Sequence, residues 1–233
     1  MRKYSPCWQK NGSLTLFDEA NPGEIIEWAI SRYADMIMTT GLNLSGTVLL
    51  DIANKAGFDG KVVFVDTGFH FPETLKFWDD LQKRYQGVSF VKLRSETDTG
   101  LLFESNPVQC CELNKVAPLN LYLSENNPSA LLNARTRDSA QGRKDLVAFE
   151  PGAPAHINPL FKWTRSELES YAESESLEIH PLYRSGFLSM GCWPCTKAVR
   201  PGDDARSGRF VGQGRTECGL WGTVGAEGAT QSR

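Results

Sequence analysis

Residues 61–68 read KVVFVDTG, and this stretch decides the fold class of the chain. Its four consecutive apolar residues are typical of a strand buried on both faces, and a Thr-Gly pair ends it. A helix is predicted over Pro72–Tyr85, because proline suits a first turn and Glu73 suits the positive end of the helix dipole. Val88–Leu93 is the next apolar run. A strand, a helix and a strand in this order predict a parallel sheet.

The same alternation continues on both sides of this unit. Upstream we expect a helix over Gly23–Ala34, a strand over Met36–Thr40 and a helix over Thr47–Ala56. Downstream, the expected elements are a helix over Asn106–Leu123, a strand over Ala130–Ala134, a polar loop over Arg135–Arg143, short strands within Leu146–Pro159, and a helix over Thr164–Glu175 that begins with a Thr164–Glu167 capping box. The pattern predicts an α/β fold with an open, mostly parallel sheet and helices on both faces.

The composition is typical of a globular protein with an ordinary content of charged residues. Hydrophobic residues make up 40% of the 233 residues, and 25 basic against 28 acidic residues give a net charge of −3. An acidic balance disfavours general nucleic-acid binding, and no apolar run is long enough for a membrane span. The first residues lack the apolar stretch of a secretory signal, so we expect a cytosolic protein. We expect one α/β domain over residues 1–200 and a glycine-rich, mobile segment over residues 201–233.

The strand ends indicate where a ligand binds. In open α/β sheets ligands bind outside the carboxyl ends of the strands, which here singles out residues 39–47 and 66–74. The loop Gly41–Gly46 opens a helix and suits a phosphate, although no Gly-Lys-Ser/Thr follows it as in a Walker A loop. An ordinary strand-to-helix turn explains the loop equally well.

Four of the six cysteines form two pairs. Cys110 and Cys111 are adjacent, and Cys192 and Cys195 are separated by two residues. Four thiolates can hold zinc or an iron–sulfur cluster. Neighbouring helical residues point about 100° apart, so the adjacent pair reaches two irons of a cubane more easily than one small ion. We therefore favour [4Fe–4S] over zinc, with buried, unligated cysteines as the alternative.

Cys218 stands apart from these pairs. It lies in a glycine-flanked stretch, after a basic run over residues 197–215. Nearby positive charge lowers the pKa of a thiol and attracts anions, so Cys218 is a candidate nucleophile. An incidental cysteine in a tail is an equally good interpretation on composition alone. Cys7 shows no partner pattern.

Five segments of the chain together resemble one known family. They are VVFVDTG with FPET at 62–74, Cys110-Cys111 with Lys115, HPLY followed by GFLSMGCWPCT at 180–196, Arg206-Ser-Gly-Arg209, and ECGL at 217–220. These motifs are similar to those of the assimilatory adenylyl-sulfate (APS) reductases, relatives of the PAPS reductases.

The resemblance implies a fold of the adenine-nucleotide α-hydrolase (PP-loop) type and a [4Fe–4S] cluster on Cys110, Cys111, Cys192 and Cys195. It implies that Cys218 attacks the sulfate of APS, releases AMP and carries an S-sulfonate. Thioredoxin, or a glutaredoxin-like thiol donor, then frees sulfite for cysteine biosynthesis. The candidate substrate-binding residues are Lys115, Arg206, Arg209, Arg137 and Arg143, with Thr40, Ser45, Asp66, Thr67 and Gly68 at the strand ends.

The chain departs from the family pattern at three places. Trp221 follows the ECGL motif where the family usually has histidine. The nucleotide loop, usually Ser-Phe-Gly, reads Gly41-Leu-Asn43 here. The paired arginines of the family are represented by Arg135 and Arg137, which are separated by a threonine.

Three alternatives stay open from the sequence. The first is a PAPS reductase, although its members generally lack the two cysteine pairs. The second is a PP-loop enzyme that thiolates tRNA, but no SGGxDS-like loop or basic RNA-binding face is visible. The third is a zinc-binding interaction module, which has no use for Cys218. A homo-oligomer is compatible with all of them.

Overall fold

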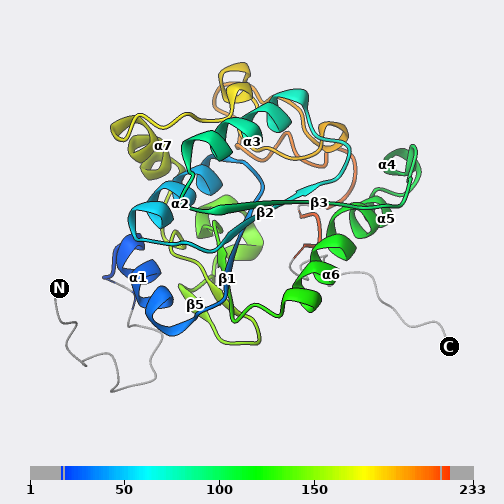
Figure 1. Ribbon diagram of the computed structural model, residues 1–233. Helices are drawn as coiled ribbons and strands as arrows, with labels where there is room; N and C mark the ends of the chain where they lie inside the picture. The colour runs from blue at the N-terminus through cyan, green and yellow to red at the C-terminus, as the bar shows by residue number, and fades with distance from the viewer. Residues whose placement is uncertain (1–16, 18, 216, 221–233) are drawn as a thin grey trace.

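The computed structural model describes residues 17, 19–215 and 217–220, which form an α/β fold around one six-stranded sheet (Figure 1). The strand order is β3-β2-β1-β4-β6-β5, with every neighbouring pair parallel except β5 and β6. The strands are β1 Met36–Thr40, β2 Lys61–Asp66, β3 Ser89–Arg94, β4 Ala130–Asn133, β5 Phe149–Glu150 and β6 Ala155–Ile157. The predicted mostly parallel sheet is confirmed, and β2 has the predicted bounds.

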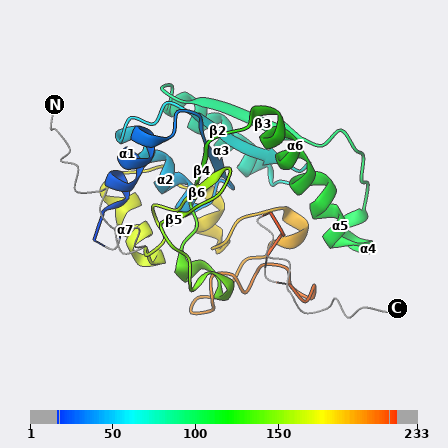
Figure 2. The ribbon, with the colours of Figure 1, turned by 90° about the horizontal axis from the view of Figure 1, so that it is seen from below.

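Helices cover both faces of the sheet, as predicted (Figure 2). The α-helices are α1 Pro22–Arg32, α2 Leu44–Lys55, α3 Pro72–Arg84, α4 Leu102–Ser105, α5 Pro107–Cys111, α6 Ala117–Asn126 and α7 Arg165–Ser174. Alternate strand residues point to opposite faces, so Val62 and Phe64 pack in the larger core with α1, α2, α3 and α7. Val63 and Val65 pack on the other face with Leu119 of α6. No described helix is long and apolar enough to span a membrane.

Two helices differ from their predicted bounds for local reasons. Helix α2 begins at Leu44, because the Asn43 side chain accepts the Gly46 N–H and caps the helix three residues early. The single helix predicted over Asn106–Leu123 is instead α5, a π-helical turn at Glu112–Val116 and α6. Helix α7 carries the predicted capping box between Thr164 and Glu167.

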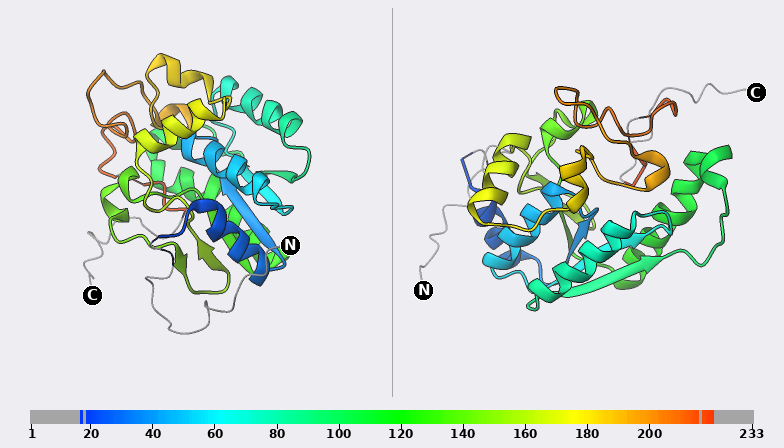
Figure 3. Two further views of the ribbon diagram at one scale, coloured as in Figure 1. Left: turned by 90° about the vertical axis from the view of Figure 1, so that its left-hand side faces the viewer. Right: turned by 90° about the horizontal axis from the view of Figure 1, so that it is seen from above.

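The described part of the C-terminal segment packs against the domain. Figure 3 shows its orange and red ribbon running along one side of the domain, and Arg215 Nη1 lies 3.4 Å from Sγ of Cys111 in α5. The Phe210 ring is buried, and its backbone N–H donates to the Cys195 carbonyl at 3.1 Å. Leu220 packs against the smaller apolar cluster. These contacts bring residues 217–220 back to the carboxyl ends of the strands.

Candidate active site

A cavity of about 710 Å³ lies at the carboxyl ends of β1, β2 and β4. The 41–45 loop, the segment after β4 and the C-terminal segment form its walls. Seven of the residues singled out from the sequence line it: Thr40, Ser45, Lys115, Arg143, Arg206, Arg209 and Cys218. The cavity thus lies at the edge of the sheet where the sequence predicts a ligand site.

The 41–46 loop closes on itself. Its Leu42 N–H donates to Thr40 Oγ1 at 3.1 Å, and its Gly46 N–H donates to Asn43 Oδ1 at 2.9 Å. Its Leu44 N–H donates to the Tyr183 hydroxyl at 3.0 Å. Three backbone donors that could hold a phosphate thus have acceptors within the protein. The loop therefore forms part of the cavity wall, and these three N–H groups are not available to bind a phosphate.

Cys218 lies half-buried on the cavity wall beside two cations. Burial raises the pKa of its thiol, but the charges of Lys115 and Arg209 and the backbone N–H of Leu220 outweigh burial and lower the pKa below its ordinary value. A thiolate is therefore favoured at this position, which is what a nucleophilic cysteine requires.

Lys115 belongs to the π-helical turn that follows Cys110 and Cys111. Such turns often interrupt α-helices at functional sites, and this one separates Lys115 from the two cysteines at the end of α5. Among the described residues, no carboxylate forms an ion pair with Lys115 or with Arg209. These two cations are available to an anionic ligand and to the Cys218 thiolate.

Arg209 is held by backbone carbonyls. Its Nη1 donates to the Met190 carbonyl, and its Nε donates to the Cys195 carbonyl at 3.3 Å. Its guanidinium lies against Gly191, where a Cβ atom would come within 2.6 Å of Arg209 Cζ. The glycine of the Gly-Cys-Trp-Pro-Cys motif thus makes room for Arg209.

We expect Gly191→Ala to lower turnover roughly tenfold to a hundredfold without unfolding the protein, because only the flexible end of Arg209 has to move. Steady-state rates and the melting temperature check this result. Gly87→Ala is the matched control, since its Cβ would make an ordinary contact of 3.6 Å with Asn54. Equal losses in both variants, or full activity in Gly191→Ala, would contradict the assignment.

Arg143 and Arg206 face a carboxylate. Glu217 Oε1 lies 2.9 Å from Arg143 Nη2, and its Oε2 lies 3.3 Å from Arg206 Nη2. All three side chains line the cavity. Arg137 does not line it: its Nε donates to the Leu146 carbonyl at 2.7 Å and its guanidinium stacks on Phe161.

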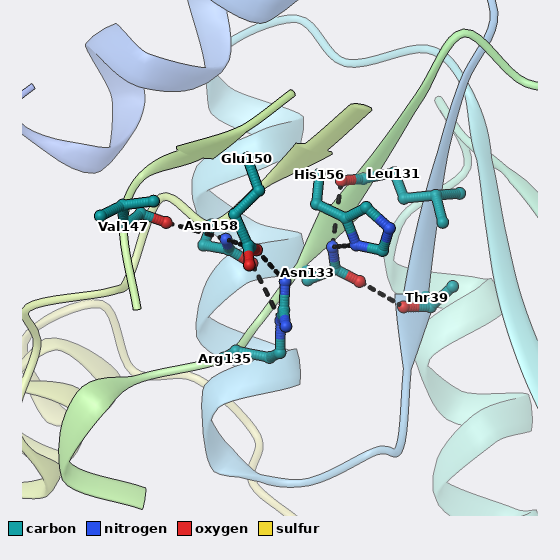
Figure 4. A network of polar contacts seen from close by, with 8 residues as sticks. All are labelled: Thr39, Leu131, Asn133, Arg135, Val147, Glu150, His156 and Asn158. Carbon is teal, nitrogen blue, oxygen red and sulfur yellow. Dashed lines mark hydrogen bonds and ion pairs between the residues drawn. The ribbon is translucent and has the colours of Figure 1, made fainter. Parts of the chain in front are cut away.

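Arg135, not Arg137, reaches the cavity from this segment (Figure 4). Its Nε donates to Asn158 Oδ1 at 3.1 Å, and its guanidinium pairs with Glu150. Sequence reasoning missed Arg135, Glu150 and Glu217 as cavity residues. Glu217 could have been found from its place beside Cys218, whereas Glu150 carries no local signal.

His70 is a further cavity residue that the sequence did not reveal. Its Nε2 lies 3.1 Å from the Val65 carbonyl, so Nε2 carries the proton. Burial, followed by the charge of Lys115, lowers its pKa to about 4, so the imidazole is neutral at pH 7. Nδ1 is buried and has no hydrogen-bond partner among the described residues.

The two cysteine pairs line a second, small cavity on the other side of Lys115. Cys192 Sγ lies 3.1 Å from Thr67 Oγ1, and Arg215 Nη1 lies 3.4 Å from Cys111 Sγ. Within the described part of the chain, no three His, Cys, Asp or Glu side chains are arranged to hold a single metal ion. The four thiols thus share a cavity without converging on one point.

The remaining candidates have structural surroundings or lie outside the described residues. Asp66 accepts the Gly68 N–H at 3.0 Å in a turn, and neither residue lines the large cavity. His180 is fully buried and bonds Thr74, as a structural histidine does. Cys7 and Trp221 lie outside the described residues.

The sequence of this chain is similar to those of known proteins. The model of the phosphoadenosine phosphosulfate reductase domain matches residues 35–198. An adenosine 5'-phosphosulfate reductase of Deinococcus radiodurans is 52% identical over 210 residues, which cover 87% of this chain and 82% of that protein. Adenosine 5'-phosphosulfate reductase 1 of Bacillus subtilis is 33% identical, covering 84% of this chain and 88% of that protein.

Solved structures show the same fold. A phosphoadenylyl-sulfate (PAPS) reductase from Candida auris, in a phosphate complex, superposes with a TM-score of 0.68 at 25% identity, over 77% of this chain and 92% of that chain. An FMN adenylyltransferase from Candida glabrata superposes with a TM-score of 0.59 at 14% identity, over 76% of this chain and 64% of that chain, which is a likeness of fold alone. By the matched domain and these identities, the chain belongs to the phosphoadenosine phosphosulfate reductase family.

Proposed function

We propose that this protein reduces adenosine 5'-phosphosulfate to sulfite and AMP in the assimilation of sulfate. The observation that carries the proposal is that Cys218, Lys115 and Arg209 line one cavity at the carboxyl ends of the parallel strands, and that neither cation forms an ion pair with a carboxylate in the described part of the chain. The D. radiodurans relative, 52% identical, bears the name of this activity. In this scheme residues 1–200 bind the nucleotide and residues 201–233 carry the nucleophile.

In the first step the Cys218 thiolate attacks the sulfur of the sulfate group. The bond between that sulfur and the bridging phosphate oxygen breaks, so AMP leaves and Cys218 carries an S-sulfonate. A thiolate that approaches an anionic group meets repulsion, which Lys115 and Arg209 offset by facing the sulfate oxygens. Arg209 in its fixed position can donate more than one hydrogen bond to them.

In the second step a dithiol supplies both electrons. One thiolate of the donor attacks Cys218 Sγ and expels sulfite, leaving a mixed disulfide. The second donor thiol then attacks this disulfide, restores Cys218 and leaves the donor oxidised. We propose a thioredoxin or a glutaredoxin-like protein as this donor, in the cytosol where such dithiols are kept reduced.

The adenosine end of the substrate lies toward the strand ends in this proposal. Thr40 and Ser45 line that part of the cavity and offer hydroxyl groups. Asp66, Thr67 and Gly68 form the turn after β2, on the side of the cysteine pairs, and their contact with substrate stays a prediction.

Cys110, Cys111, Cys192 and Cys195 are the residues that would hold a [4Fe–4S] cluster. The observation that supports the fit is that the four thiols line one small cavity. When bound, the cluster would act electrostatically, since the dithiol already carries the two electrons. Arg215 and Asn114, which lie against Cys111 and Cys110, would then donate hydrogen bonds toward cysteine sulfurs.

The test uses anaerobically purified protein incubated with APS in the absence of thiols. We expect an intact mass increased by one sulfonate on the Cys218 peptide, removed by reduced thioredoxin, in a protein whose iron content and visible spectrum report the cluster. A parallel incubation with PAPS identifies the nucleotide. An adduct from PAPS alone would replace APS by PAPS as substrate, and no adduct from either would contradict the proposed function.

A further inference from the structure

The Glu217 side chain joins three distant parts of the chain. It is 13% exposed and pairs with Arg143 and Arg206, each 22% exposed. Arg143 comes from a 3₁₀ turn after β4, and Arg206 comes from the segment after the second cysteine pair. Each carboxylate oxygen lies at ion-pair distance from one arginine, and Oε1 is buried without a hydrogen-bond partner among the described residues, so its contact with Arg143 is electrostatic. Such a largely buried, doubly paired carboxylate fixes the backbone next to Cys218.

The cations around the cavity therefore divide into two groups. Arg143 and Arg206 share the single carboxylate of Glu217, whereas Lys115 and Arg209 have no carboxylate partner among the described residues. The sequence suggested that Arg206 binds the substrate. Its position suggests a different task, because its guanidinium already holds an anion supplied by the protein.

A carboxylate beside the nucleophile is electrostatically unfavourable for the reaction. The negative charge of Glu217 opposes formation of the Cys218 thiolate and repels an incoming sulfate. An amide or an apolar residue at position 217 would avoid both effects. The carboxylate therefore needs a compensating benefit, and its two ion pairs provide one by fixing the position of the segment.

We propose that Glu217 is a positioning residue that seats Cys218 at the cavity by binding Arg143 and Arg206. The catalytic consequence of this seating rests on the proposed function, but the seating itself does not. Residues before and after Glu217 also contact the domain. Arg215 lies against Cys111, and Leu220 packs on the smaller apolar cluster. Glu217 is the ionic contact between them.

The first experiment measures seating without any substrate. Iodoacetamide, a neutral reagent, alkylates the protein over a range of pH, and mass spectrometry follows the Cys218 peptide. The plateau rate at high pH reports accessibility, while the midpoint reports the thiol pKa. We expect Glu217→Gln to raise the plateau alkylation rate of Cys218 roughly tenfold. The variant loses both ion pairs with the largely buried arginines, so the segment that carries Cys218 is held less firmly.

The arginines provide a double-mutant cycle. Arg143→Gln combined with Glu217→Gln is expected to expose Cys218 no more than Glu217→Gln does, since both changes break the same contact. Asp145→Asn is the matched control, because Asp145 lines the same cavity, is exposed and forms no ion pair with another described residue, so it should leave the plateau unchanged. Lys115→Met should also leave the plateau unchanged. An unchanged plateau in Glu217→Gln overturns the proposal.

The second experiment separates position from binding. We expect Glu217→Gln to slow S-sulfonate formation about tenfold in a single turnover while the Kd for AMP stays the same, and Glu217→Asp to recover part of the rate and of the protection. If the Glu217→Gln variant does not fold, the same measurements are made on Glu217→Asp. Equal protection of Cys218 in wild type and both variants overturns the seating role. Wild-type protein that protects Cys218 through Glu217 but forms no adduct with either nucleotide would instead contradict the proposed function alone.

Discussion

Cys218→Ser is expected to abolish sulfite release, with a loss of about 10³-fold or more, while the protein stays folded. The hydroxyl of serine ionises far less readily than a thiol whose pKa is lowered by Lys115 and Arg209, so the first bond to sulfur does not form. Sulfite release with a dithiol donor measures turnover, and intact mass after incubation with APS measures the adduct.

Cys7→Ser is the control for this variant, since Cys7 shows no partner pattern and belongs to neither cysteine pair. It should keep both turnover and the adduct. Iron content of Cys218→Ser should equal that of the wild type, because Cys218 is outside the four-cysteine cavity. A Cys218→Ser protein that still releases sulfite at a comparable rate would remove Cys218 from the mechanism.

Lys115→Met is expected to lower the rate of S-sulfonate formation roughly 10²- to 10³-fold at neutral pH. The substitution keeps most of the side-chain volume but removes the charge that offsets burial of the Cys218 thiol. Without that charge the pKa of Cys218 rises, so less thiolate is present at neutral pH. The loss is therefore greatest at low pH and decreases as the pH rises through the new pKa.

The pH profile of single-turnover adduct formation checks this expectation. Part of the loss should persist at high pH, because Lys115 also neutralises the sulfate in the transition state. Lys144→Met is the control, since Lys144 is exposed and does not line the cavity. A uniform loss with an unshifted pH limb would mean that Lys115 acts on the substrate alone and does not influence the thiol.

Local patterns in the sequence predicted most of the fold. The apolar run of β2, the proline and glutamate at the start of α3 and the capping box of α7 act over a few residues, so neighbouring letters reveal them. The π-helical turn at Glu112–Val116 was not predicted, because its signal is a change of hydrogen-bond spacing that the α-helical periodicity does not carry.

The sequence also indicated which residue types form the site, but it did not indicate which residues they contact. The hydroxyl of Tyr183, 139 residues from Leu44, accepts the Leu44 N–H in the 41–46 loop, and no local pattern connects the two residues. Arg135 and Arg137 are two positions apart, and no local pattern in the sequence shows which of them lines the cavity. In the structure Arg135 lines it and Arg137 does not. The path of the backbone after β4 decides between them.

The sequence by itself determined the α/β class, the edge of the sheet where the cavity lies, and the two cysteine pairs and Cys218 as candidate site residues. Tertiary structure alone decided which cations are available to a ligand. Among residues 19–215 and 217–220, no carboxylate pairs with Lys115 or Arg209, whereas the fold directs Glu217 to Arg143 and Arg206. The charge that an arginine presents to a ligand depends on which carboxylate the fold brings within about 4 Å of it, and that contact is set by packing between elements far apart in the chain.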